Sequence, residues 1–263
     1  MALFTDGSIS TIGDLAGYES SILEVAKTER IDLSRKLKLA EEEIRVDLQA
    51  FLSRQDDTGE FDPLLNLTAV TPWWRIDQIV VTEPLHKWHT FRALSLTYRD
   101  AYNRQMNDRF QGKWTEYDAL AGWASGALFE TGVGMVSDPV PRAAQPQITT
   151  AAGTLAAATY FASVTWIGHT GAEGAPSELV SITVPANNKL IVTAVNPPAG
   201  VIGWNVYASY SAADLTLQNG TPVEASQPWI EPATGLMKGK AVGDGQHPET
   251  FLQQSERRLI LRG

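Results

Sequence analysis

Hydrophobic side chains in the first half of the chain recur every three or four residues, the spacing of an amphipathic helix. The pattern predicts a helix over residues 12–27, capped by Ser10 or Thr11. A second helix is expected to begin after Asp32, which can cap it. Its apolar positions are Leu33, Leu37, Ala40, Ile44, Leu48, Phe51 and Leu52. Ordering each helical residue costs roughly 1–2 kcal/mol of backbone entropy, so this helix must bury its apolar side against neighbours.

Two further helices are expected after residues 55–72, a stretch rich in Asp, Gly, Asn and Pro that is typical of a long connection. Thr82 followed by Glu83 and Pro84 is a favourable helix start, because proline fits the first turn and threonine can accept a hydrogen bond from a free backbone N–H. The last helix is expected over residues 108–130, with Gly132 as its stop. Residues 1–136 are therefore predicted to form a bundle of about four helices.

The hydrophobic spacing changes from 3.6 to two residues in the second half of the chain. Residues 137–146 contain three prolines and predict an extended linker. Apolar and polar residues then alternate from Tyr160 to Ile167, and β-branched or aromatic runs follow at residues 179–184, 190–195 and 203–210. Short strands at this spacing indicate an immunoglobulin-like or fibronectin-like β-sandwich over residues 147–246, with Trp166 and Trp204 in its core, before a tail of residues 247–263. The predicted fold class is multidomain α + β.

Composition narrows the classes of function. The 263 residues are 43% hydrophobic and 19% charged, the balance of a folded globular protein, so neither half is expected to be disordered. No cysteine is present, which excludes disulfides, a thiolate nucleophile and thiolate metal ligands. No run approaches the roughly 18 apolar residues of a membrane span, and the first residues do not read as a secretory signal.

Both halves of the chain are acidic. Residues 1–145 hold 15 Lys and Arg against 22 Asp and Glu, and residues 146–263 hold 6 against 8. Tight binding to nucleic acid requires a surplus of Lys and Arg to neutralise phosphates, so such binding is disfavoured. An acidic surface that DNA passes without adhering remains compatible with these charges.

No catalytic or cofactor-binding pattern stands out. His86 and His89 share one side of the third helix, one turn after Glu83, but no further ligand cluster accompanies them, so ordinary polar positions are favoured over a metal site. The glycines around Ser125 lack the Gly-x-Ser-x-Gly spacing of a hydrolase elbow. The sequence predicts neither an enzyme nor a bound cofactor.

Two segments are candidates for contact with a partner protein. Trp73 and Trp74 follow Pro72 in an irregular stretch, where core packing and partner contact are both open. The last residues combine apolar and basic side chains that can add a strand to another chain's sheet edge, or else dock on their own chain or remain disordered. The candidate residues of this tail are Phe251, Arg257, Arg258, Leu259, Leu261 and Arg262.

The helical half resembles the head-to-tail adaptor (connector) proteins of tailed bacteriophages. The resemblance covers roughly residues 10–135 and rests on a diffuse pattern at residues 13–19, 31–33, 38–44, 88–94 and 98–103. Separately, residues 160–166, 173–178 and 203–207 resemble fibronectin type III-like modules attached to phage structural proteins. The two resemblances reinforce each other, because a helical adaptor with an appended sandwich fits a virion.

The adaptor resemblance implies a homo-oligomeric ring, commonly of twelve copies, in the neck of the virion. Such a ring docks beneath the portal protein and above tail or neck proteins, and double-stranded DNA passes through its centre. It also implies that a terminal extension, here about residues 249–263, grips the portal. Two other interpretations stay open: a carbohydrate- or cell-surface-binding module that presents Trp229, and a hydrolase that uses Glu83, His86 or His89.

Overall fold

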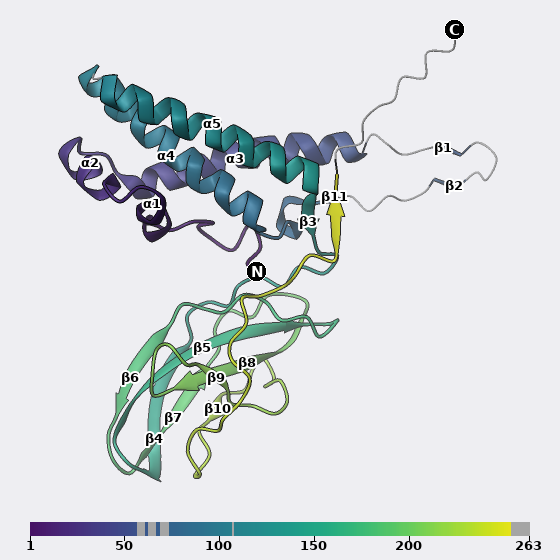
Figure 1. Ribbon diagram of the computed structural model, residues 1–263. Helices are drawn as coiled ribbons and strands as arrows, with labels where there is room; N and C mark the ends of the chain where they lie inside the picture. The colour runs from purple at the N-terminus through teal and green to yellow at the C-terminus, as the bar shows by residue number, and fades with distance from the viewer. Residues whose placement is uncertain (57–60, 63–66, 69–73, 107, 254–263) are drawn as a thin grey trace. The chain divides into compact units, whose positions relative to one another are not determined.

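The chain contains helices in its N-terminal half and antiparallel sheets in its C-terminal half, and is mixed α and β (Figure 1). The computed structural model describes residues 1–56, 61–62, 67–68, 74–106 and 108–253. The chain divides into two compact units. The helical unit comprises Gly7–Met135 and Pro248–Gly263, and the β unit comprises Met1–Asp6 and Val136–His247. The first six residues therefore belong with the sheets, although they precede the helices in sequence.

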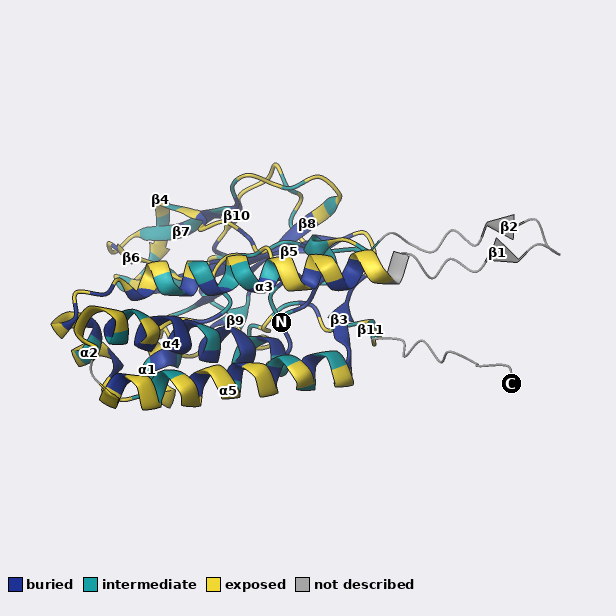
Figure 2. Ribbon diagram, turned by 90° about the horizontal axis from the view of Figure 1, so that it is seen from above, coloured by how far each residue is buried: buried dark blue, intermediate teal, exposed yellow. Residues whose placement is uncertain are grey.

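The helical unit is built around three long helices. Its elements are α1 (Ile12–Tyr18), α2 (Ile22–Thr28), α3 (Leu33–Asp56), the two-residue strands β1 (Phe61–Asp62) and β2 (Leu67–Thr68), the 3₁₀ helix η1 (Ile76–Gln78), α4 (Glu83–Gln105), α5 (Asp108–Thr131), β3 (Val133–Met135) and β11 (Thr250–Leu252). Helix α4 lies between α3 and α5 (Figure 2), and α4 also contacts α1. Its buried side chains, which include Phe91, Leu94 and Tyr98, form the centre of the unit.

The prediction of one helix over residues 12–27 is wrong. The chain leaves the helical conformation at Glu19, which is extended, and starts again at Ile22. The reason is tertiary: the Glu19 carboxylate accepts a hydrogen bond from the Tyr117 hydroxyl at 3.0 Å and lies 3.0 Å from Lys113 Nζ. Contacts with α5, which sequence spacing cannot show, hold Glu19 outside a helix.

The predicted caps have different outcomes. Asp32 caps α3 as expected, because its Oδ1 accepts hydrogen bonds from the backbone N–H groups of Ser34 and Arg35 at 2.9 and 3.3 Å. Thr11 and Asp14 form a reciprocal capping box at α1. Thr82 precedes α4 as predicted, but its hydroxyl is not a cap. The Thr82 Oγ1 atom is buried and has no hydrogen-bond partner among the described residues.

This contrast predicts that replacing threonine with valine changes the stability of the protein differently at Thr82 and at Thr11. Thr82→Val removes a buried hydroxyl that makes no bond, so the free energy of unfolding should stay constant or rise by up to about 1 kcal/mol. Thr11→Val removes a side chain that caps α1 and should lower the free energy of unfolding by about 1 kcal/mol. Urea unfolding followed by circular dichroism measures both. A clear loss of stability in Thr82→Val would show that its hydroxyl is hydrogen-bonded.

The β unit consists of two antiparallel sheets that share one core. Its strands are β4 (Gln147–Leu155), β5 (Ala158–Gly168), β6 (Val180–Val184), β7 (Asn188–Thr193), β8 (Val201–Ser209), β9 (Thr216–Leu217) and β10 (Trp229–Ile230). The strand orders are β10-β7-β4 and β6-β5-β8-β9. Trp166 and Trp204 face each other across β5 and β8 and are fully buried, as predicted. Side chains from β7 and β10, Leu190, Val192 and Trp229, belong to the same core.

The second face of β5 and β8 is also buried, through a polar network centred on Glu173. Its Oε1 atom accepts hydrogen bonds from Thr165 Oγ1 at 2.5 Å, Tyr207 Oη at 2.6 Å and Asn205 Nδ2 at 3.1 Å. Burial and the neighbouring Glu173 raise the pKa of Tyr207 above its ordinary value. A buried polar network is stable when its members are bonded in this way, so we interpret this network as structural.

Candidate functional site

The histidine pair predicted on α4 does not converge on one point. His89 is fully buried, with its Nε2 atom 3.0 Å from the Leu37 carbonyl and its Nδ1 atom 2.9 Å from Ser10 Oγ. His86 instead lies beside Asp14, at 3.6 Å, and Glu83 pairs with Lys87 at 3.1 Å. Both nitrogens of His89 are thus occupied by the protein, which leaves no ring nitrogen for a metal or a substrate.

Burial controls the protonation of His89. Desolvation lowers its pKa to about 4, and the hydrogen bond to the Leu37 carbonyl offsets only part of this effect. A carbonyl oxygen accepts only, so Nε2 carries the proton and Nδ1 accepts from Ser10. Within the described part of the chain, no group of three or more His, Asp or Glu residues is placed to hold a metal ion.

The described partner-binding candidates flank the short strand β3. Trp74 is half-buried just before η1, and Ile79, directly after η1, forms a bridge with Met135 of β3. Phe251 lies on β11, which pairs with β3 on its other side, and its side chain is 53% exposed. The segments that carry Trp74 and Phe251 are therefore separated by β3. Trp73, Arg257, Arg258, Leu259, Leu261 and Arg262 lie outside the described residues.

The start of the predicted tail pairs within its own chain. Thr250, Phe251 and Leu252 face Met135, Gly134 and Val133 in an antiparallel ladder. Gly134 makes close packing possible here, since an added Cβ atom would lie 2.8 Å from Pro248. Of the alternatives for the tail, docking on its own chain holds for residues 250–252.

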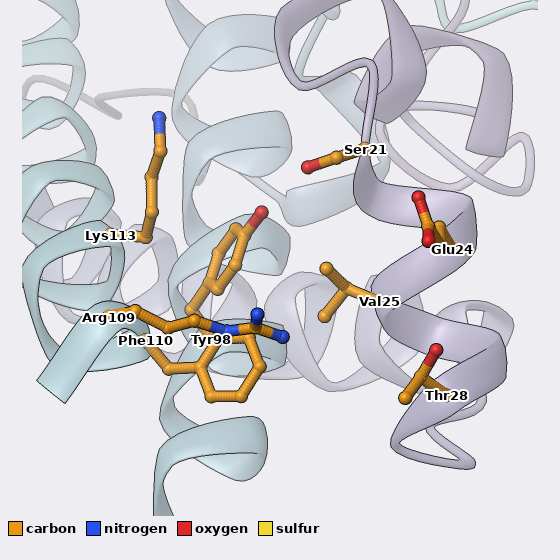
Figure 3. A pocket seen from close by; sticks show the side chains of 8 residues that line it. All are labelled: Ser21, Glu24, Val25, Thr28, Tyr98, Arg109, Phe110 and Lys113. Carbon is orange, nitrogen blue, oxygen red and sulfur yellow. The ribbon is translucent and has the colours of Figure 1, made fainter. Parts of the chain in front are cut away.

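A first pocket lies between α2 and α5, at the N-terminal end of α5 (Figure 3). It encloses about 280 Å³ and is lined by Ser21, Glu24, Val25, Thr28, Tyr98, Arg109, Phe110 and Lys113. The Arg109 guanidinium lies 4.4 Å from the centre of the Phe110 ring, and burial raises the pKa of Tyr98. Glu19 raises the pKa of Lys113 through their hydrogen bond. This α2–α5 pocket is aromatic at its base and cationic on the α5 side.

A second and larger groove runs over α4 between α3 and α5. The α3–α5 groove encloses about 540 Å³ and is lined by Glu43, Ile44, Val46, Asp47, Trp88, Arg92, Asp118, Ala121, Gly122 and Ser125. Arg92 lies at its centre and bridges Glu43 at 2.5 Å and Asp118 at 3.0 Å. Asp47 has no ion-pair partner among the described residues. The groove therefore carries three carboxylates against one cation, beside the exposed side chain of Val46.

Sequence reasoning missed both surfaces, because their residues come from helices far apart in the chain. One signal was present: Val46 is an apolar residue among the charged positions of α3, and it is 63% exposed. Such a side chain contributes nothing to the core of its own helix bundle. Both surfaces combine charged side chains with apolar or aromatic ones, a lining that suits a charged and partly apolar binding partner.

No helix in the described part of the chain combines the length and hydrophobicity needed to cross a membrane. Comparisons with protein-family models, curated proteins and solved structures gave no match.

Proposed function

We propose that the protein is a virion structural protein, the head-to-tail adaptor of a tailed bacteriophage. In this proposal the helical unit forms a ring, commonly of twelve copies in proteins of this kind, between the portal protein and the tail or neck proteins. Double-stranded DNA passes through the ring without specific binding, which the net charge of −9 favours. The resemblance in residues 10–135 supports this assignment, and the outer face of α5 is the observation that carries it.

The outer face of α5 combines small residues with an exposed tryptophan. Gly112, Ala119 and Gly126 recur at seven-residue intervals and are exposed, and Trp123 on the same side is 59% exposed. A Cβ atom added at Gly112 or Gly126 would meet no atom within 4 Å among the described residues, the adjacent turns of the helix backbone aside. Packing within the subunit therefore gives no reason for these glycines.

Helix stability argues that something outside the subunit requires them. Each glycine inside a helix costs about 1 kcal/mol relative to alanine. Small residues allow a neighbouring surface to approach closely, and a tryptophan beside them supplies the kind of anchor that dominates protein interfaces. A neighbouring copy in a ring accounts for both features, since ring contacts join different faces of identical subunits.

The β unit fits a fibronectin type III-like module in this proposal. Two antiparallel sheets around a tryptophan-centred core, with seven strands of two to eleven residues, support that finer assignment. The carbohydrate-binding alternative is weaker, because Trp229, the aromatic residue on which it depended, is only 8% exposed and packs in the core. We propose that the module projects from the ring or meets the tail.

The test is ring formation with and without the tryptophan. We expect the wild-type chain to form rings that bind portal protein, as measured by mass determination and negative-stain imaging. Trp123→Asp places a charge in the proposed interface and should reduce the ring fraction at least tenfold while the helix signal in circular dichroism stays unchanged. Ile202→Asp, at an exposed apolar position of the β unit, is the matched control and should assemble normally. A wild-type monomer that ignores portal protein would overturn the proposal.

A further inference from the structure

We propose that the α3–α5 groove is the binding site of the chain's own C-terminal segment, residues 254–263. This inference stands independently of the adaptor function, because it rests on the groove, on the point where β11 ends and on the residues that follow. The groove is a docking surface with a defined charge and an apolar side, and the segment carries the complementary side chains.

Charge complementarity is the first argument. Glu43, Asp47 and Asp118 leave the groove with a net negative charge, since Arg92 is their only cationic neighbour among the residues that line it. Residues 254–263 contain Arg257, Arg258 and Arg262 against a single acidic residue, Glu256. Arginine suits this role because its guanidinium binds a carboxylate through two parallel hydrogen bonds.

The carboxylates retain capacity for additional donors. Arg92 reaches Oε2 of Glu43 and Oδ1 of Asp118, and Ser95 also donates to Oδ1 of Asp118. The side chains of Glu43 and Asp118 remain 41% and 54% accessible. A carboxylate offers about four acceptor positions, so arginines arriving from solvent can join these groups without displacing Arg92.

Apolar contact is the second argument. Val46 is exposed at the edge of the groove, whose deeper part is lined by Ile44, Trp88 and Ala121. The segment places Leu259, Ile260 and Leu261 between its arginines. Covering Val46 with these side chains removes apolar surface from water on both partners.

The point where β11 ends puts the groove within reach. Gln253 Nε2 donates a hydrogen bond to the Thr131 carbonyl, at the last residue of α5. Ser125, which lines the groove, precedes Thr131 by six residues, about 9 Å along the helix. Ten extended residues span about 33 Å, which is enough to cover the groove from this starting point.

The α2–α5 pocket is a poor site for the same segment. Arg109 and Lys113 outnumber Glu24 in the lining of the α2–α5 pocket, so the pocket carries a net positive charge that would repel a segment with three arginines. Lys113 is also 18 residues from Thr131 along α5, a separation of about 27 Å. Both charge and distance therefore select the α3–α5 groove.

Disulfide trapping tests the proposal directly, because the natural chain contains no cysteine. The full-length double variant Val46→Cys/Ile260→Cys should form an intramolecular disulfide under mild oxidation and remain at the mass of one chain. The matched control is Leu23→Cys/Ile260→Cys. Leu23 is likewise an exposed apolar residue, but it belongs to α2, one of the two helices that form the α2–α5 pocket. We expect at least tenfold less disulfide in the control.

Charge reversal separates guided docking from random collision. Adding Arg257→Glu and Arg258→Glu to the Val46→Cys/Ile260→Cys chain should lower the disulfide yield at least fivefold, whereas Arg257→Lys and Arg258→Lys should retain most of it. Moderate salt screens these charges and should lower the disulfide yield of the Val46→Cys/Ile260→Cys chain that keeps its arginines. Equal disulfide yields in the Val46→Cys and Leu23→Cys double variants would overturn the proposal, and so would a yield that charge reversal leaves unchanged. A product at twice the chain mass would also overturn it, because it would assign the groove to a second copy of the chain. Ring assembly of the wild-type chain is measured separately, so either proposal can fail alone.

Discussion

Replacing Trp204 with alanine is expected to lower the free energy of unfolding of the β unit by about 3–5 kcal/mol. Its side chain is fully buried, faces Trp166 across the β5–β8 ladder and belongs to the core shared by both sheets. The indole Nε1 atom also donates to the Glu224 carbonyl at 3.0 Å. The substitution therefore creates a large cavity and removes a partner from a backbone carbonyl in the same step.

Two further variants separate these contributions. Trp204→Phe keeps much of the side-chain volume but lacks the indole N–H donor, so it should lower the free energy of unfolding by a smaller amount, about 1–3 kcal/mol. Ile202→Ala changes an exposed residue of the same strand and should stay within about 0.5 kcal/mol of the wild type. Urea unfolding of the full-length chain, followed by the sheet signal in circular dichroism, provides the comparison. A loss below about 1 kcal/mol in Trp204→Ala would contradict the packing of this core.

The long elements were predictable because their signals are repetitive. Helix α3 begins directly after Asp32, and α5 ends one residue beyond the predicted end and stops at Gly132, which has a positive φ of 104°. Strand β5 contains the whole alternating run from Tyr160 to Ile167. Each of these signals extends over several turns or alternations, so local spacing is sufficient to reveal it.

The features that the sequence hid depend on contacts between distant segments. Glu19 interrupts the first predicted helix because α5 binds its carboxylate. Trp229 follows a turn-rich stretch that offers no periodicity, yet its pairing with Val192 of β7 places it in the core. Tertiary contacts outweigh local propensity at both positions.

The candidate binding surface was hidden for the same reason. Asp47, Arg92 and Asp118 belong to three helices and form no linear motif, and only packing assembles them into one groove. Helix spacing did predict that α3, α4 and α5 share a core. It gave no information on which polar positions face each other across the opening, because that depends on the rotation of each helix about its axis.

Acid is expected to destabilise the helical unit through His89. The His89 imidazole is neutral in the folded chain because burial lowers its pKa from 6.5 to about 4, whereas in the unfolded chain it retains the ordinary value. Well above pH 6.5, His89 is deprotonated in both the folded and the unfolded chain, so it contributes no pH dependence to the free energy of unfolding. Between about pH 6.5 and 4 only the unfolded state takes up the proton, so stability falls as the pH falls. The full loss, reached below about pH 4, is on the order of 3 kcal/mol.

Urea unfolding from about pH 7.5 to about pH 4.5, followed by the helix signal in circular dichroism, measures this slope. His89→Gln removes the titration and keeps an amide that can donate to the Leu37 carbonyl, so its stability should depend less steeply on pH over this window. Because His89→Gln and the wild-type chain differ in this one titratable group, a difference in slope between them isolates the contribution of His89. Equal slopes would mean that His89 accepts a proton in the folded protein as readily as in the unfolded chain, and that its contacts with Ser10 and Leu37 hold the charged ring.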